Sequence, residues 1–170
     1  KPRHPMNEYI MNGGDIVQVF IEQCRRKGQV PFVSVRLNDG HRLENRNKDK
    51  PAGADWHCLS RFYVENAPEY CIGPSLRSWD QRVQDWAIPE VRDYKFKLIE
   101  DLCENYDIAG LELDYMRHSS YFDVDQTTST QRAIIMTDFI KRIRMALDRT
   151  ERNAQHRWLS VRVPCYTVMY

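Results

Sequence analysis

Residues 108–115 alternate between apolar and acidic side chains, and this alternation constrains the fold more than any other stretch. Leu111, Leu113 and Tyr115 share one face of the predicted strand, because strand side chains have a period of two. Glu112 and Asp114 share the other face. Carboxylates are rarely buried unless they are paired or used, so the acidic face indicates either an active site or a set of structural ion pairs.

Three helical patterns alternate with three strand patterns along the chain. Apolar residues recur at helical spacing after Asp15, after Pro89 and after the threonines within 128–130. Strands are predicted at 31–38, 108–115 and 158–163, each with one apolar and one polar face. This order predicts a parallel α/β sheet with right-handed crossovers. In the second helix, the predicted buried stripe is Val91, Tyr94, Leu98, Leu102 and Tyr106, with Ile99 and Cys103 beside it.

The two-faced strands favour a (β/α) barrel over an open doubly wound sheet. Strands of a doubly wound sheet are covered on both faces and read as nearly continuous apolar runs. A complete barrel needs about 250 residues, whereas this chain has 170. We therefore expect residues 1–170 to be part of a single (β/α)8 barrel domain. The remaining strands are expected from a longer parent chain or from another copy.

The longest stretch without clear periodicity runs from residue 39 to residue 88. A loop of this length is usually functional or disordered, and its aromatic content argues against disorder. The rings are predicted to form the small core of the loop, while stacking on a flat ligand stays an alternative. They belong to Trp56, Phe62, Tyr63, Tyr70, Trp79 and Trp86.

The composition argues against several classes of function. A net charge of +1 argues against a nucleic-acid partner. No apolar run approaches the roughly 18 residues that a membrane-spanning helix needs, so no membrane partner is expected. The five histidines are scattered without metal-binding spacing, and phosphate-loop and dinucleotide motifs are absent. No metal and no cofactor is therefore predicted.

The five cysteines are far apart and form no C-x-x-C motif. Cys24 and Cys103 fall on apolar stripes of predicted helices, so we expect both to be buried thiols. Cys58 and Cys71 share the long loop and could pair in an oxidising compartment. The compartment stays open on this reasoning, with a secreted or periplasmic parent as one alternative.

Two segments carry a resemblance to a known family. Residues 89–94 (Pro-Glu-Val-Arg-Asp-Tyr) and 110–117 (Gly-Leu-Glu-Leu-Asp-Tyr-Met-Arg), with the helix between them, resemble the glycosyl-hydrolase-like family 10, formerly called domain of unknown function 187. The first predicted helix and residues 32–38 are similar to that family's second helix and third strand. The resemblance implies a (β/α)8 barrel that hydrolyses an oligo- or polysaccharide, with strands three to five present in this chain.

The same resemblance assigns a role to one carboxylate. It aligns Asp114 with the strand-four aspartate, a position similar to the nucleophile of the alpha-amylase family. The usual Asp-Gly that precedes this strand is Ala109-Gly110 here, which is a departure from the pattern. A chitinase mechanism is unlikely, because Met116 occupies the position of the catalytic glutamate in that family.

Glycoside hydrolysis usually needs two carboxyl groups, about 5–5.5 Å apart in retaining enzymes and about 6.5–9.5 Å apart in inverting ones. Asp114 is the predicted nucleophile or charge-stabilising carboxylate. Glu112, one pleat deeper, is predicted to be a structural acid paired with Arg36 or Arg162. The polar side chains expected to bind the substrate are those of Arg36, Asn38, His41, Glu112, Tyr115, Arg117, His118 and Arg162.

A catalytically silent barrel that binds carbohydrate or a protein is the alternative, because a fold does not fix a function. The discriminating feature is a second carboxylate within reach of Asp114. Glu112 and the loop acids Asp39, Asp123 and Asp125 are the candidates that the sequence offers.

Overall fold

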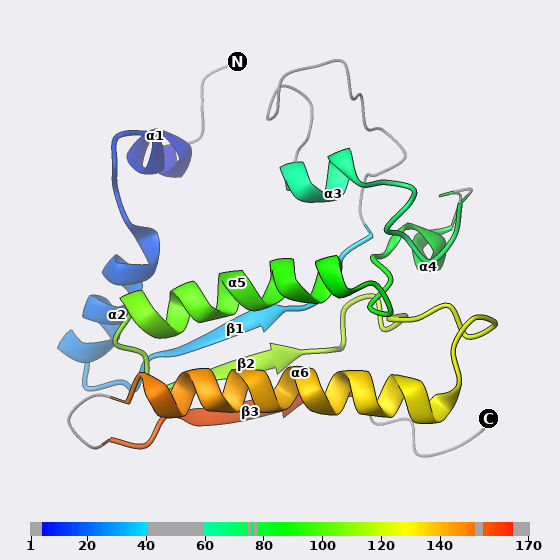
Figure 1. Ribbon diagram of the computed structural model, residues 1–170. Coiled ribbons are helices and arrows are strands. Elements are labelled where there is room, and N and C mark those ends of the chain that lie inside the picture. The colour runs from blue at the N-terminus through cyan, green and yellow to red at the C-terminus, as the bar shows by residue number, and fades with distance from the viewer. Residues whose placement is uncertain (1–4, 41–59, 75, 77, 152–154, 165–170) are drawn as a thin grey trace.

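The computed structural model describes residues 5–40, 60–74, 76, 78–151 and 155–164. Within these ranges, three parallel strands form one sheet in the order β1-β2-β3 (Figure 1). The predicted α/β class with parallel strands is therefore confirmed. The strands are β1 (Phe32–Arg36), β2 (Gly110–Asp114) and β3 (Trp158–Arg162).

Two of the three long helices begin at capping residues that the sequence offers, and the helix between them begins at Pro89 without a side-chain cap. Asp15 accepts a hydrogen bond from the Gln18 amide at 2.9 Å at the start of the first long helix. Thr128 and Gln131 form a reciprocal capping box at the start of the last. Figure 1 shows two of these helices side by side on one face of the sheet. The helices are α2 (Ile16–Arg26), α5 (Pro89–Asn105) and α6 (Ser129–Arg149).

Three short helices lie where the sequence predicts none. None of the residues of α1 (Pro5–Met11) is buried, although Met6, Tyr9 and Ile10 stand at helical spacing. The long loop contains α3 (Arg61–Glu65) and α4 (Trp79–Arg82), and residues 41–59 lie outside the described ranges. Tyr63 is buried in a small cluster with Ala67, Cys71 and Leu76, which confirms a loop core for this ring. Trp86 is buried in the main core instead, with its ring against those of Tyr121 and Phe139. Trp56 is not among the described residues.

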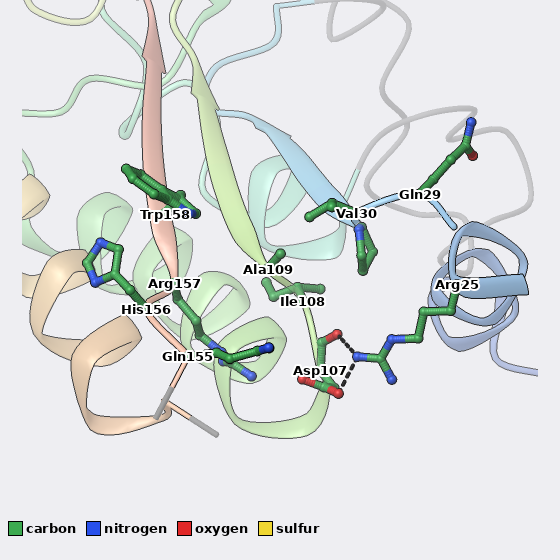
Figure 2. Close-up of a pocket in the computed structure, with 11 residues that line it drawn as sticks. Arg25, Gln29, Val30, Asp107, Ile108, Ala109, Gln155, His156, Arg157 and Trp158 are labelled. Carbon is green, nitrogen blue, oxygen red and sulfur yellow. Dashed lines mark hydrogen bonds and ion pairs between the residues drawn. The ribbon is translucent and has the colours of Figure 1, made fainter. Parts of the chain in front are cut away.

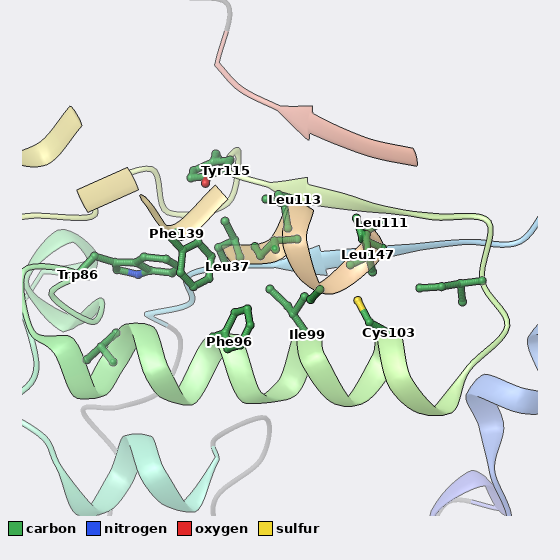
Figure 3. Close-up of a cluster of buried hydrophobic side chains, with 14 of the residues drawn as sticks. Leu37, Trp86, Phe96, Ile99, Cys103, Leu111, Leu113, Tyr115, Phe139 and Leu147 are labelled. Carbon is green, nitrogen blue, oxygen red and sulfur yellow. The ribbon is translucent and has the colours of Figure 1, made fainter. Parts of the chain in front are cut away.

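The main core lies between the sheet, α5 and α6 (Figure 3). Leu111 and Leu113 on β2 are fully buried in it, as the alternation predicts. The predicted stripe on α5 is wrong in one respect, because Leu98 is 48% exposed. Successive residues of an α-helix are turned by about 100°, so Leu98 faces solvent when Ile99 faces the sheet. The buried residues of α5 are Val91, Phe96, Ile99 and Cys103.

The face of the sheet opposite α5 and α6 carries no covering layer in the described part of the chain. Phe32 and Trp158 on this face are 46% and 62% exposed. The Phe32 ring lies over Gly110, where an added Cβ would come within 2.6 Å of it. The outer edges of β1 and β3 have no paired strand among the described residues.

The two thiols predicted to be buried differ in their surroundings. Cys103 is fully buried, and burial raises the pKa of its thiol to about 11. Cys24 is only partly buried on α2. Cys58 lies outside the described residues, so its pairing with Cys71 stays untested. Among the described helices, none combines the length and apolar character that crossing a membrane would require.

Candidate functional site

Asp114 is the last residue of β2, at the end of the sheet where loops follow parallel strands. Its side chain is 13% exposed on the uncovered face. One carboxylate oxygen accepts a hydrogen bond from the Met116 amide at 2.9 Å. The other lies 4.0 Å from a guanidinium nitrogen of Arg162, which occupies the matching position on β3. The carboxylate is thus held in place from two directions and still reached from the open face.

Glu112 and Arg36 have other partners than the predicted ones. Glu112 accepts a hydrogen bond from the Ser34 hydroxyl at 2.8 Å, because the strand register sets Ser34 directly opposite it. Arg36 lies opposite Asp114, yet its guanidinium contacts Asp39 at 3.4 Å. The predicted pairing of Glu112 with Arg36 or Arg162 is therefore not found.

His118 lies at the same end of the sheet, in the loop that follows β2. Its Nδ1 accepts a hydrogen bond from the Gly40 amide at 3.2 Å and lies 3.7 Å from an Asp39 oxygen. The ring of His118 packs against that of Trp79, with 5.4 Å between the ring centres. The structure therefore brings together Arg36, Asp39 and His118 beside the end of β1.

Asn38 and Tyr115 are turned away from the uncovered face. Asn38 is fully buried, and its amide donates to the carbonyls of Gln84 and Ser120 at 3.1 and 2.9 Å. Tyr115 is buried on the Leu113 side of β2, and burial raises the pKa of its phenol to about 12. In this conformation both residues have structural surroundings, and neither side chain reaches the face that carries Asp114.

The remaining predicted substrate-binding residues are Arg117, His41 and Arg162. Arg117 is exposed in the loop after β2. His41 lies outside the described residues. Arg162 is largely exposed on the uncovered face, near Asp114.

Two titratable side chains near this end of the sheet, those of Lys95 and Tyr121, are not predicted as site residues from the sequence. Burial lowers the pKa of Lys95 on α5 to about 8, while the charge of Asp39 acts in the opposite direction. Burial raises the pKa of the Tyr121 phenol, and the charges of Tyr115 and Asp114 act in the same direction. The rings of Tyr115 and Tyr121 lie 5.3 Å apart. Their hydroxyls have no hydrogen-bond partner among the described residues, and no local sequence pattern signals this.

Two cavities lie at opposite ends of the sheet. One of about 490 Å³ lies at the amino-terminal end of the strands, between Arg25, Asp107, Arg157 and Trp158 (Figure 2). A groove of about 480 Å³ follows the loop after β2 and the start of α6, with Tyr121 in its wall. Ligands of parallel α/β sheets bind at the carboxyl ends of the strands, so the groove lies at the relevant end. Asp114 does not line either cavity.

One exposed cluster has the donor types of a metal site. The ligand atoms of Asp148, Glu151 and His156 all lie within 4.8 Å of one another. Arg144 already binds Asp148 at 2.7 Å, and the Glu151 carboxylate lies 3.3 Å from His156. These contacts explain the cluster as surface ion pairing.

Comparisons with known proteins add no relative. A scan against models of protein families found no match, and a search of curated proteins found none either. The similarity to the glycosyl-hydrolase-like family therefore rests on the two quoted segments and on the order of helices and strands. What it implies about activity is carried forward as a proposal.

Proposed function

We propose that this protein is a glycoside hydrolase acting on an oligo- or polysaccharide, with Asp114 as its nucleophile or charge-stabilising carboxylate. The observation that carries the proposal is the placement of Asp114. A carboxylate at the carboxyl end of a parallel strand, reachable from an uncovered face and close to an arginine, is in the position that barrel enzymes use for chemistry.

The proposal includes a (β/α)8 barrel. Three parallel strands in sequential order, with α5 and α6 on one face, fit an arc of such a barrel. The uncovered face would then be its interior, and the unpaired edges of β1 and β3 would join neighbouring strands. A longer parent chain or another copy would supply these strands, together with the second carboxylate that hydrolysis needs.

A catalytically silent barrel that binds carbohydrate or protein is the second candidate. The observation in its favour is that the two nearby acids are already engaged within the described part of the chain. Glu112 is hydrogen-bonded to Ser34, and Asp39 contacts Arg36. Neither is placed as an obvious proton donor for a leaving group.

The test is a hydrolysis assay on a panel of oligosaccharides, with release of reducing ends as the readout. Loss of an essential catalytic carboxylate costs at least about 10²-fold, so Asp114→Asn is expected to lower kcat/KM by this factor or more. Asp138→Asn is the matched control, because Asp138 lies exposed on α6, away from Asp114, and pairs with Lys141 at 3.8 Å. It should keep the activity of the parent chain.

Three results separate the candidates. Full activity of Asp114→Asn, with unchanged circular dichroism, would remove Asp114 from the mechanism. Sugar binding by tryptophan fluorescence or calorimetry without release of reducing ends would favour the silent barrel. Neither binding nor hydrolysis, in this chain and in a longer parent, would reject both candidates.

A further inference from the structure

His118 connects the ends of two neighbouring strands. It follows β2 in the loop, and its Nδ1 accepts the amide hydrogen of Gly40, which follows β1. Its backbone is left-handed, with a φ of 48°, a conformation in which histidine, asparagine and aspartate are enriched among non-glycine residues. Only 14% of the side chain is exposed. The imidazole therefore has a defined position rather than that of a solvated surface group.

Gly40, the partner of His118 in this hydrogen bond, is packed tightly against α4. A Cβ at this position would come within 2.8 Å of the Trp79 carbonyl oxygen, so the backbone here lies directly against α4. The Trp79 ring also packs on the imidazole of His118. The contact between Gly40 and His118 thus joins the end of β1, the start of α4 and the loop after β2.

The Nδ1 atom of His118 meets two groups with opposite requirements. The Gly40 amide, 3.2 Å away, needs a lone pair on Nδ1 and hence an unprotonated nitrogen. The Asp39 carboxylate, 3.7 Å away, attracts a protonated Nδ1. One nitrogen cannot accept and donate at once, so the protonation state decides between the two partners.

We infer that His118 is a pH-operated switch that exchanges its Nδ1 partner between the Gly40 amide and the Asp39 carboxylate. In the neutral form Nδ1 accepts from Gly40 and ties the loop after β2 to the end of β1. In the protonated form Nδ1 donates to Asp39, and the Gly40 amide loses its acceptor. Histidine is the side chain whose charge normally changes between about pH 5 and 8, so the exchange falls in a physiological range.

The exchange affects the candidate site through Arg36. Arg36 contacts the Asp39 oxygen that His118 does not face, at 3.4 Å. A protonated His118 adds a second positive charge beside this carboxylate, which weakens the attraction between Asp39 and Arg36 next to the open face that carries Asp114. The switch is a property of these local contacts, and it does not depend on the proposed hydrolase activity.

Other charged groups near His118 influence the pH at which its imidazole is protonated. Asp39 is the nearest carboxylate, and its charge also acts on the ammonium group of Lys95. The segments that contact His118 also carry charged residues, namely Arg36 and Asp39 at the end of β1, Asp80 and Arg82 on α4, and Asp114 and Arg117 around the end of β2. Each stays unchanged in the test below, apart from Asp39 in one variant.

The experiment is a pH titration of the whole chain by ¹H–¹⁵N NMR, with the His118 imidazole and the Gly40 amide followed together. The Gly40 amide resonance should move with the same midpoint as the imidazole. Its hydrogen-exchange protection should fall about fivefold across the transition, the equilibrium effect of one ordinary hydrogen bond. No movement of Gly40 while the imidazole titrates would overturn the inference, as would an imidazole that stays neutral down to about pH 5.

Two variants make the test specific. His118→Asn offers an Oδ1 acceptor at the place of Nδ1 and tolerates the left-handed backbone, but it cannot be protonated. In this variant the Gly40 resonance should be independent of pH, and a persisting transition would refute the assignment. Asp39→Asn removes the competing carboxylate, so the transition should move to lower pH. If His118→Asn does not fold, the parent chain and Asp39→Asn still decide, because an unmoved transition contradicts the exchange.

Discussion

Replacement of Arg157 by methionine should destabilise the protein strongly, because one guanidinium joins the ends of two helices. Arg157 is only 2% exposed, beneath the start of β3. One of its nitrogens donates to the Cys103 carbonyl at 2.7 Å and to the Thr150 hydroxyl at 3.0 Å. Another donates to the Tyr106 carbonyl at 2.9 Å. Cys103 and Tyr106 end α5 and Thr150 ends α6, so the positive charge lies at two negative helix termini.

The magnitude follows from the groups that methionine leaves without a donor. A buried polar group that loses its partner costs about 1–3 kcal/mol, and two carbonyls and one hydroxyl are involved. Water can reach some of them, and removal of the guanidinium also removes its own desolvation cost. We therefore expect Arg157→Met to lower the free energy of unfolding by about 3 kcal/mol. Arg157→Lys keeps the charge but not the planar fork, so it should lose about half as much.

The assay is urea unfolding followed by far-ultraviolet circular dichroism. With a slope of about 2 kcal/mol per molar urea, the expected loss moves the midpoint down by about 1.5 M without changing the slope. Arg149→Met is the matched control, because Arg149 lies exposed near the same helix ends and pairs with Glu100 and Glu104. It should cost far less, since exposed ion pairs contribute little. A loss below about 0.5 kcal/mol for Arg157→Met would refute the reasoning.

Two further predictions concern β2. Gly110→Ala should lower the free energy of unfolding by about 1–3 kcal/mol, because the new methyl would lie 2.5 Å from the Trp158 carbonyl oxygen. Ser160→Ala on the same face is the control, and equal urea midpoints for the two variants would contradict the prediction. The folded pKa of Tyr115, raised by burial to about 12, lies above its usual 10.0. Its stabilising contribution is therefore complete below about pH 10 and lost as the pH rises through about 12. As the pH rises from about 10 to about 12, the free energy of unfolding should fall less for Tyr115→Phe than for the parent chain or the Tyr9→Phe control. Equal falls in all three proteins would argue against a buried Tyr115 phenol.

The helices and strands that carry the core could be predicted because their signals are local. The alternation around Leu111 and Leu113 needs no knowledge of the partner strands, and the same holds for the caps at Asp15 and Thr128. The helix α1 has only 7 residues, too few for the spacing of Met6, Tyr9 and Ile10 to indicate a helix, and none of its residues is buried. The error in the predicted buried stripe of α5 has a related cause. Leu98 and Ile99 are both apolar, and only the position of the sheet determines that Ile99 is buried and Leu98 exposed.

The partners of the site residues depend on strand register, which the sequence of one strand does not contain. Alternation places Glu112 and Asp114 on one face, but it does not say what lies opposite them. The register sets Ser34 beside Glu112. The Glu112 carboxylate is therefore hydrogen-bonded to a hydroxyl, whereas its charge alone suggests an arginine as the partner. Arg36 then pairs with Asp39, three residues along the chain, and the other oxygen of the Asp39 carboxylate faces His118.

Polar residues just beyond a strand have two possible roles, and burial decides between them. Asn38 is expected in the substrate site because alternation over residues 31–38 sets it on the polar face with Ser34 and Arg36, but β1 ends at Arg36. The loops after β1 and β2 instead converge over it, and they bring the backbone groups of Gln84 and Ser120 out of contact with water. Buried backbone carbonyls need a hydrogen-bond donor and buried amides need an acceptor, and the side chain of one asparagine supplies both. The Asn38 side-chain oxygen accordingly accepts a hydrogen bond from the Gln84 amide at 3.2 Å. The same convergence of loops that buries Asn38 leaves Asp114 on the open face, so loop packing separates the buried polar residue from the accessible one.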